Sequence, residues 1–384
     1  MRDMTVEVMV GNKAAATAAK LSRVQVAVAF PVTPQTTIVE YLNEFITKGE
    51  MDCEFINVEG ELTAQVVVQA ASRIGVRTFC CTSGPGCLYM HHPMHDTSSL
   101  RLPVVMAVVH RGNKGMQPDH TDLMSHIMTG WIQWYVENNQ EVLDSIIMAY
   151  RVAEDMRVRI PIAVGYDGYI LSYTAEPVDI PDQEEVDDFL PPYKPTPSLM
   201  PEDFDPKAPR WWRVPWEEHH KVIVDAKEVI KEVNEEFGKR FGRSYGNGLV
   251  EEYRCEDAEA VIVAMGTIAS TARDAIDNLR AAGKPIGLVK LKCLIPFPYE
   301  DFQRIGSEVR AIGMVDRNVC LGVGGVGHTF IRNAIYDLEE RPRVLGFHAG
   351  LAGKEVKVSD IEHMAEKVLK AARGESVSPL VEWV

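Results

Sequence analysis

The sequence predicts an α/β protein with two units, each built on a mainly parallel sheet. Short apolar runs alternate with helix-period segments from residue 1 to about residue 180, and the alternation resumes at Ala258 after an interruption. Most of these runs are nearly continuous, as expected for strands that helices cover on both faces. A chain of 384 residues is also long enough for two or three domains that each bury a core.

The larger unit is expected to span residues 1–180. Its strands are predicted at 24–30, 53–58, 78–82, 104–109 and 160–166, and a helix is predicted at 61–74. Cys80 and Cys81 fall inside one of the strands. We therefore expect both to be buried thiols that pack as small apolar side chains.

Residues 181–250 are predicted to form a connector. Its first part is rich in proline and acidic residues and has little periodicity, whereas residues 217–241 predict one long amphipathic helix. The apolar face of that helix repeats at helical spacing: Val222, Ala226, Val229, Val233, Phe237 and Phe241. Residues 251–384 then predict the smaller α/β unit, with strands at 260–265, 286–291, 311–315 and 344–347 and a helix at 270–282.

Composition excludes several classes of protein. The formal net charge is −15 and the basic residues form no stripe, so nucleic acid is a poor candidate partner. No run approaches the roughly 20 apolar residues of a spanning helix, and the first residues lack the apolar core of a secretory signal. We therefore expect a cytoplasmic protein with no membrane partner.

Cysteines, histidines and glycines give few signals of a cofactor held by this chain alone. The seven cysteines show no CxxC spacing, so iron–sulfur clusters or structural zinc are not expected here. His91, His92 and His95 lack a nearby carboxylate or cysteine at ligand spacing, which favours surface or interface histidines over a metal site. The glycine-rich segments at 84–86 and 322–327 lack the GxGxxG pattern and favour turns at helix starts.

The segment FPVTPQT at residues 30–36 ends a predicted strand and precedes a helix. Pro31 and Pro34 bracket Thr33, which restricts the backbone around the threonine hydroxyl. Thr33 either presents this hydroxyl to a ligand or caps the helix that begins near Gln35. The residues alone leave both alternatives open.

The segment VEGELTA at residues 58–64 carries two acids, Glu59 and Glu61, at another strand end. An acid in the first turn of a helix can simply stabilise the helix dipole. The surroundings are apolar, however, and a carboxyl group in such a site can have a raised pKa and share a proton with a ligand nitrogen.

These motifs occur in a recognisable order: GN, FPVTPQT, VEGE, TSGPG, RLPVVMAVVHR, DHTD, TGWIQWYVENNQE, FLPPYKP, GLVEEYRCEDAE and GLAGKEV. The chain closely resembles, over essentially its whole length, the alpha subunit of the 2-oxoacid:ferredoxin oxidoreductase family. The resemblance implies a transketolase-like pyrimidine-binding domain followed by a smaller transketolase-like carboxy-terminal domain. It also implies oxidative decarboxylation of a 2-oxoacid with coenzyme A as co-substrate, giving acyl-CoA, carbon dioxide and electrons for ferredoxin or another acceptor.

The resemblance assigns roles to four residues. Glu61 matches the catalytic glutamate that bonds N1′ of the thiamine diphosphate aminopyrimidine, and Pro31 lies beside the same cofactor. Thr33 matches the threonine that hydrogen-bonds the 2-oxoacid substrate. Arg111 matches the arginine that pairs with its carboxylate.

The resemblance also implies partner subunits. A diphosphate and magnesium site needs a GDG motif followed by asparagines, and the nearest segment here, Tyr166 to Gly168 around Asp167, has no such asparagine after it. A beta subunit is expected to supply that half of the thiamine diphosphate site. Gamma and ferredoxin-like delta subunits are expected to complete the complex and to hold the 4Fe–4S clusters, in a dimer of heteromers.

Departures from the family pattern concern the choice of substrate. Gly84 and Gly86, together with Lys114 and Met116, form a predicted specificity region. The glycines and Met116 favour an apolar substituent larger than methyl, such as the phenyl ring of phenylglyoxylate, whereas Lys114 favours the second carboxylate of 2-oxoglutarate or oxalate. Pyruvate stays open. Two other functions also stay open. One is a transketolase-type or dehydrogenase-type enzyme that passes its intermediate to a sugar or lipoamide, and the other is a noncatalytic scaffold subunit.

Overall fold

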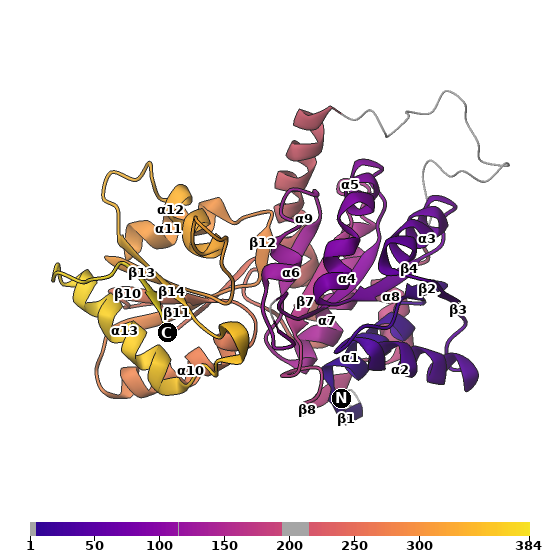
Figure 1. Ribbon diagram of the computed structural model, residues 1–384, viewed down its shortest axis with the longest axis horizontal. Helices are drawn as coiled ribbons and strands as arrows, with labels where there is room; N and C mark the ends of the chain where they lie inside the picture. The colour runs from indigo at the N-terminus through magenta and orange to yellow at the C-terminus, as the bar shows by residue number, and fades with distance from the viewer. Residues whose placement is uncertain (1–4, 114, 194–214) are drawn as a thin grey trace.

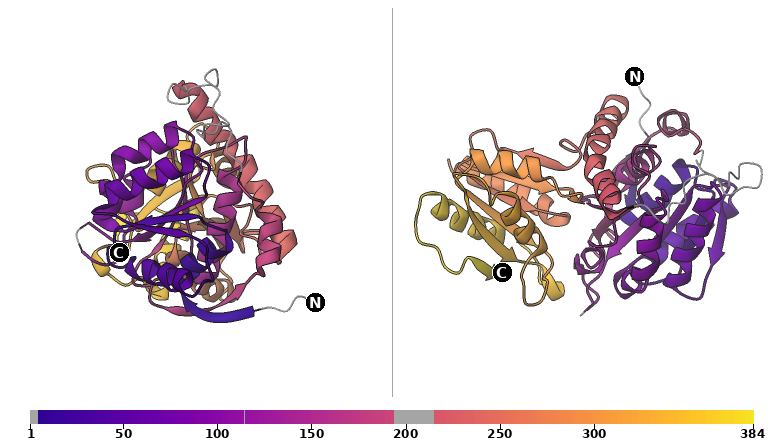
Figure 2. Two further views of the ribbon diagram at one scale, coloured as in Figure 1. Left: turned by 90° about the vertical axis from the view of Figure 1, so that its right-hand side faces the viewer. Right: turned by 90° about the horizontal axis from the view of Figure 1, so that it is seen from above.

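The computed structural model describes residues 5–113, 115–193 and 215–384. Two α/β bodies lie side by side, the first formed mainly by the amino-terminal half and the second by the carboxy-terminal part (Figures 1 and 2). Each body is built around one predominantly parallel sheet with helices on both faces. The predicted α/β class is confirmed.

The larger body contains a seven-stranded sheet. Its strands follow the order β12 (Cys293–Ile295), β6 (Ile132–Tyr135), β7 (Ile162–Asp167), β5 (Val105–His110), β4 (Thr78–Thr82), β2 (Val26–Ala29) and β3 (Glu54–Asn57). All neighbouring pairs are parallel except β12 with β6. The strands predicted in the first half are present as β2, β3, β4, β5 and β7, while β6 and β12 were not predicted.

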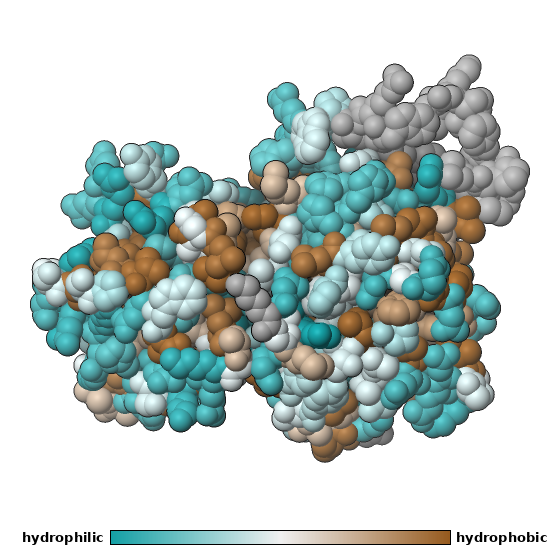
Figure 3. Space-filling view, viewed as in Figure 1, coloured by the Kyte–Doolittle hydropathy of each residue, from teal (hydrophilic) through white to brown (hydrophobic). Residues whose placement is uncertain are grey.

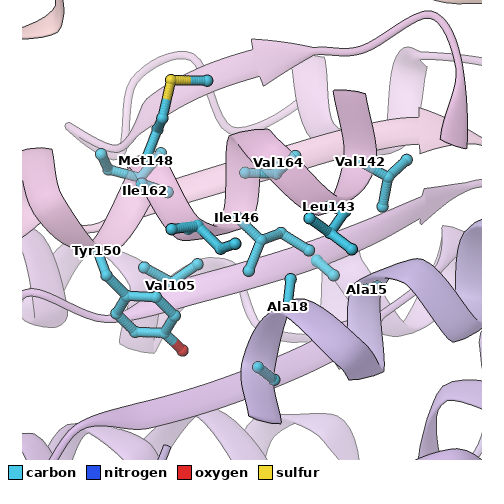
Figure 4. Packing of buried hydrophobic residues seen from close by; sticks show 14 of the residues in the cluster. Ala15, Ala18, Val105, Val142, Leu143, Ile146, Met148, Tyr150, Ile162 and Val164 are labelled. Atoms are coloured by element: carbon cyan, nitrogen blue, oxygen red, sulfur yellow. The ribbon is translucent and has the colours of Figure 1, made fainter. Parts of the chain in front are cut away.

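One face of this sheet is covered by α1 (Gly11–Leu21), α2 (Thr36–Thr47) and α7 (Asn139–Ala153), and their side chains form a large apolar core. Figure 4 shows Ala15 and Ala18 of α1 facing Leu143 and Ile146 of α7, beside strand residues that include Val105. The small alanines let the two helices approach closely. Full burial of each aliphatic side chain contributes about 1.5–3 kcal/mol, so this core is a main source of stability.

The other face is covered by α3 (Glu61–Arg73), α4 (Gly84–Tyr89), α5 (His91–Ser99) and the short α6 (Thr121–Met124). Their apolar residues belong to a cluster that continues into the second body, where it includes Phe302 and Ile331. Cys80 and Cys81 are both buried, as predicted, and lie in different clusters on opposite faces of β4.

The smaller body contains a six-stranded sheet. Its order is β15 (Val381–Trp383), β14 (Arg343–His348), β13 (Ala311–Asp316), β10 (Ala260–Ala264), β11 (Ile286–Leu291) and β9 (Val250–Tyr253). Helices α10 (Thr267–Ala281) and α13 (Val358–Ala372) pack on one face, and α11 (Tyr299–Glu308) and α12 (Val326–Ala334) on the other. The four strands predicted here are all present.

Buried polar contacts join the two bodies. Lys290, next to the end of β11, pairs with Glu141 of α7 at 2.7 Å between Nζ and Oε2, and neither side chain is more than 1% exposed. Lys292 donates to Ser145 of the same helix at 2.9 Å. Removing one member of such a pair would leave an uncompensated buried charge, so these contacts fix how the bodies meet.

The connector contains α8 (Gln183–Phe189), which was not predicted, and the long helix α9 (Trp216–Phe241). The predicted apolar face of α9 packs on α7, and the helix ends at Gly242, whose φ of 74° is the left-handed conformation typical of a helix stop. Residues 194–214 of the proline-rich segment lie outside the described residues. The division at residues 180 and 250 stays a prediction, and β12 from the second half pairs into the larger sheet.

A two-stranded antiparallel ribbon, β1 (Thr5–Val10) with β8 (Ala175–Ile180), lies apart from both sheets and was not predicted. On the surface shown in Figure 3, hydrophilic residues alternate with apolar patches over both bodies. No helix within the described ranges combines the length and the hydropathy required to cross a membrane.

Candidate active site

The predicted site residues lie at one edge of the larger sheet. β2, β3, β4 and β5 run parallel, so the segments that follow them leave the sheet at the same carboxyl edge (Figure 1). These segments carry Pro31, Thr33, Glu61, Gly84, Gly86 and Arg111. Ligands of open α/β sheets bind at this edge, so it is the candidate active site.

Glu61 is the first residue of α3 and is only 8% exposed. Among the described residues no side chain or backbone group makes a hydrogen bond or ion pair with its carboxylate. Gly86 lies directly against it: a Cβ at position 86 would be 2.3 Å from Glu61 Oε1. A nearly buried carboxylate without a partner is costly, because buried charges are normally paired, and its free oxygens are suited to a ligand that donates a proton.

Arg111 follows β5 and reaches the segment after β2. Its Nη1 donates to the carbonyl oxygen of Thr33 at 2.9 Å. On its other side is Gly84, whose φ is +47° and where a Cβ would meet the Arg111 carbonyl oxygen at 3.2 Å and its Cδ at 3.3 Å. Gly84 and Gly86 therefore leave room for Arg111 and Glu61, which lie on two sides of the same turn.

Thr33 is exposed and does not cap α2. The N-cap residue of α2 is Gln35, and no side chain caps the helix. The Gln35 side chain instead accepts from Val32 N at 3.1 Å and donates to Cys81 Sγ at 2.7 Å. The capping alternative for Thr33 is wrong, and its hydroxyl makes no hydrogen bond within the described part of the chain.

Asn12, in the GN motif near the start of the chain, fixes the same segment. Its Nδ2 donates to Pro34 O at 2.8 Å and to Thr37 Oγ1 at 2.7 Å, while Tyr166 donates to its Oδ1 at 2.7 Å. All the polar atoms of the buried amide are thus used. Sequence reasoning gave Asn12 no role, although the motif that contains it contributed to the resemblance.

Asp122, which sequence reasoning also missed, connects two of the site segments. Its Oδ2 accepts from the backbone N of Gly84 at 3.1 Å and of Arg111 at 3.0 Å, and its Oδ1 accepts from His110 Nδ1 at 2.8 Å and from Leu123 N at 2.7 Å. Burial opposes its ionisation, but these donors outweigh burial and hold the pKa of Asp122 below its usual value. The DHTD motif was the only signal for it.

A second buried aspartate, Asp167, joins the larger body to the smaller one. It accepts from His120 Nε2 at 2.8 Å and from Thr267 N at 2.9 Å, and it pairs with Arg317 Nη1 at 2.8 Å. Burial works against its ionisation, but Arg317 and His120 hold the pKa of Asp167 well below 3.8. Both oxygens of Asp167 are thus engaged inside the protein, which argues against their use as metal ligands.

The loop after Arg111 carries the predicted specificity residues. Gly112 N donates to Gln117 O at 2.9 Å and closes the loop, in which Met116 is 47% exposed. Lys114 lies outside the described residues. Gly353 of the smaller body contacts this loop, since a Cβ there would be 2.6 Å from Gln117 Cγ.

The glycine-rich segment at 322–327 and the histidines near residue 91 make contacts within the protein itself. At the start of α12, Gly327 N and His328 N donate to Asp316 at 3.0 Å each, which fills the place a phosphate would take. His91 lies 2.9 Å from the largely buried His126, nitrogen to nitrogen, and burial lowers the pKa of His126 to about 4. Within the described residues, no group of three or more histidine, cysteine or acidic side chains is arranged to hold a metal ion.

Comparison with known families identifies the chain. Residues 17–237 match the family described as "Pyruvate flavodoxin/ferredoxin oxidoreductase, thiamine diP-bdg", and residues 258–361 match "Pyruvate:ferredoxin oxidoreductase core domain II". The chain belongs to the 2-oxoacid:ferredoxin oxidoreductase family. It is an oxidoreductase subunit of the alpha type, as the resemblance implied.

Relatives of this family are similar over nearly the whole chain. The pyruvate synthase subunit PorA of Pyrococcus horikoshii is 40% identical and covers 98% of this chain and 97% of its own length. PorA of Methanothermobacter thermautotrophicus is 39% identical over 99% of this chain and 98% of its own. The ketoisovalerate oxidoreductase subunit VorA of Pyrococcus horikoshii is also 40% identical, with coverages of 98% and 97%.

Solved structures confirm the predicted transketolase-like fold. A 2-oxoglutarate:ferredoxin oxidoreductase from Magnetococcus marinus, solved with 2-oxoglutarate, coenzyme A and succinyl-CoA bound, has a TM-score of 0.72 at 18% identity, covering 96% of this chain and 66% of that chain. A split-gene transketolase, described as an inactive beta4 tetramer, has a TM-score of 0.57 at 13% identity, covering 94% of this chain and 98% of that one. At these identities the likeness concerns the fold alone.

Proposed function

We propose that this chain is the subunit that activates thiamine diphosphate and binds the 2-oxoacid in a multisubunit 2-oxoacid:acceptor oxidoreductase. The observation that carries the proposal is the place of Glu61 and Arg111 on two sides of one glycine turn at the carboxyl edge of the larger sheet. An unpartnered carboxylate and a guanidinium are the two groups that an aminopyrimidine and a 2-oxoacid carboxylate require.

The residues present fit the cofactor's pyrimidine ring. The Glu61 carboxylate is 8% exposed and has no partner among the described residues, so a protonated ring nitrogen N1′ would satisfy it. When bound, thiamine diphosphate supplies a nucleophilic carbon that attacks the 2-oxoacid carbonyl and takes up electrons after decarboxylation. The role of Glu61 is to hold the proton at N1′. Pro31 is exposed along the same edge of the sheet.

Arg111 and Thr33 bind the part of the substrate common to all 2-oxoacids. The Arg111 guanidinium uses Nη1 for the Thr33 carbonyl at 2.9 Å, which orients the group and leaves further donors for a carboxylate. The hydroxyl of Thr33 makes no hydrogen bond within the described residues and is exposed beside it. Together they would fix the carboxylate and a neighbouring oxygen of the substrate.

The substrate we propose is a 2-oxoacid with one carboxylate, either pyruvate or a larger acid such as phenylglyoxylate. The half-exposed Met116 offers an apolar surface in the loop after Arg111, and the turn at Gly84 leaves space free of side chains. The relatives named for pyruvate and for ketoisovalerate also act on acids with one carboxylate. A dianion such as 2-oxoglutarate or oxalate would depend on Lys114.

Partners complete the reaction in this proposal. A beta subunit supplies the diphosphate and metal half of the cofactor site, which is supported by the complete use of Asp167 inside this chain. Coenzyme A is the co-substrate, and gamma and ferredoxin-like delta subunits hold the 4Fe–4S clusters that pass electrons to ferredoxin. The cysteines of this chain lack cluster spacing, which agrees with that division.

A substrate panel on the assembled complex tests the proposal. Pyruvate, 2-oxoisovalerate, phenylglyoxylate, 2-oxoglutarate and oxalate would be assayed with coenzyme A and a viologen acceptor. We expect turnover of the acids with one carboxylate, and we expect Arg111→Ala to raise KM for each by about tenfold or more, because a charge-assisted contact is lost. Preference for a dianion that disappears in Lys114→Ala would contradict the proposed substrate class.

A further inference from the structure

Asp122 is fully buried and holds the two segments that flank the proposed carboxylate site. One oxygen, Oδ2, accepts both the backbone N–H of Gly84 at 3.1 Å and the backbone N–H of Arg111 at 3.0 Å. Residues 84 and 111 belong to segments that follow different strands, β4 and β5. A single carboxylate oxygen therefore fixes the distance between the glycine turn and the arginine.

The two segments lie in close contact at Gly84 and Arg111. Gly84 approaches the Arg111 side chain so closely that a Cβ would be 3.3 Å from both its Cβ and its Cδ. A side chain at position 84 would press on Arg111, so the glycine lets the two segments lie this close. Within the described residues, the guanidinium makes one hydrogen bond, from Nη1 to the Thr33 carbonyl at 2.9 Å.

We propose that Asp122 is a positioning residue for the 2-oxoacid: it sets the place of the Arg111 guanidinium through the main chain of Arg111 and through the turn at Gly84. The inference rests on the proposed function, in which Arg111 binds the substrate carboxylate. Asp122 itself does not touch the substrate, because it is 0% exposed behind the site.

A layered aromatic and polar network holds Asp122 in turn. His110 donates to its Oδ1 at 2.8 Å, and the His110 ring stacks on Tyr135 with centroids 5.2 Å apart and an angle of 11° between the planes. The ring of His120 lies 4.7 Å from that of His110 and bonds Asp167, which accepts from Thr267 of the smaller body. This network connects Asp122 to the contact between the two bodies.

Asp122→Asn tests the inference on the assembled complex. The amide has the same shape but cannot accept all four hydrogen bonds, so we expect KM for the 2-oxoacid to rise about tenfold while KM for coenzyme A and kcat change little. The matched control is Asp316→Asn, a fully buried aspartate that also binds backbone N–H groups at a helix start, away from the site. Equal effects of both variants on every kinetic constant would overturn the inference.

Coupling to Arg111 separates this inference from the proposed function. In an Arg111→Ala background, Asp122→Asn should raise KM no further, since Asp122 acts only through Arg111. If Arg111→Ala itself leaves KM unchanged, the proposed function fails. If Arg111→Ala raises KM and Asp122→Asn does not, or if the two effects multiply, the positioning role fails while the proposed function stands.

A second pair of variants covers the case in which Asp122→Asn does not fold. His110→Ala removes one donor to Asp122 and should raise KM in the same direction, and His110→Asn, whose amide can donate from nearly the place of Nδ1, should restore it. Amide hydrogen exchange of the complex should be faster at residues 84 and 111 in His110→Ala than in His110→Asn. The same KM in both variants and in the wild type would overturn the inference.

Discussion

Two glycine-rich helix starts in this molecule look alike in sequence but differ in what their glycines face. Both follow a parallel strand at its carboxyl end: the segment 84–86 leads from β4 into α4, and the segment 322–327 leads from β13 into α12. At α12 the missing side chains make room for Asp316, from the strand just before. At α4 they make room for Glu61 and Arg111, which come from two other segments.

The two helix starts differ in whether a carboxylate without a partner lies against the glycines. At α12 the aspartate accepts the free backbone N–H groups of Gly327 and His328, and Asn318 accepts that of Val326 at 3.0 Å, so the protein satisfies its own helix start. At α4, Asp122 accepts the backbone N–H of Gly84 at 3.1 Å in the same way. Glu61, which lies against Gly86, nevertheless keeps its carboxylate without a partner among the described residues. Segment 84–86, where Glu61 and Arg111 from two other segments meet, is therefore the one that we propose to be functional.

The largest effect we expect in this comparison is that of Glu61→Gln. Turnover of the assembled complex should fall by roughly 10²- to 10⁴-fold, because an amide cannot hold the proton at N1′ as a carboxylate does. Glu59→Gln is the control: Glu59 is exposed and accepts from Thr63 Oγ1 at 2.5 Å, so its change should have little effect. Equally fast proton exchange at the cofactor C2 in wild type and Glu61→Gln would refute the assignment.

Gly86→Ala is expected to have the next largest effect, because it changes the turn beside Glu61. The added Cβ would lie 2.3 Å from Glu61 Oε1 and must displace that carboxylate, and a misplacement of about 1 Å can cost on the order of 10²-fold in rate. Steady-state kinetics should show a lower kcat, while thermal unfolding of the chain changes less than in the corresponding variant at α12. An unchanged kcat would show that Glu61 does not need its observed place.

Gly325→Ala should lower the stability of the chain and leave its kinetic constants nearly unchanged, the reverse of Gly86→Ala. Its Cβ would lie 2.0 Å from Asp316 Oδ2, so the closed helix start is disturbed, and we expect a loss of about 1–3 kcal/mol in the free energy of unfolding. The kinetic constants of the assembled complex should stay close to those of the wild type. Denaturant unfolding compared with turnover checks this, and a large fall in kcat without a loss of stability would make the second segment functional too.

The smallest expected effect is the pH dependence of the stability that the buried Asp316 and Asp122 contribute. Burial raises the pKa of Asp316 above 3.8, so its contribution to stability is largest in acid and falls as the pH rises through the shifted pKa. The pKa of Asp122 is lowered, so its contribution is present above 3.8 and is lost as the pH falls below that value.

The free energy of unfolding should be measured between roughly pH 3 and 7, which spans the usual carboxyl pKa values. The contributions of the two aspartates should show opposite trends with pH. The stability margin of the wild type over Asp316→Asn should narrow toward neutral pH, and its margin over Asp122→Asn should narrow toward acid. Parallel trends for the two variants would contradict the difference between the sites.

The sequence by itself determined most of the regular structure and the central residues of the site. Apolar runs and helical spacing predicted the parallel strands and the helix α9, because those patterns record local burial and local period. The motifs around Thr33, Glu61 and Arg111 placed these residues at strand ends, where the structure has them. Their roles remain predictions that the experiments above test.

Only the tertiary structure decided which groups meet. Asp122 contacts Gly84, 38 residues away in sequence, and Asp167 contacts Thr267, 100 residues away. Likewise β12, a strand of three residues, pairs with β6 of the other body. Local pattern carries no information about such partners, because hydrogen bonding and charge pairing depend on distances in space that are fixed only when both sheets are packed.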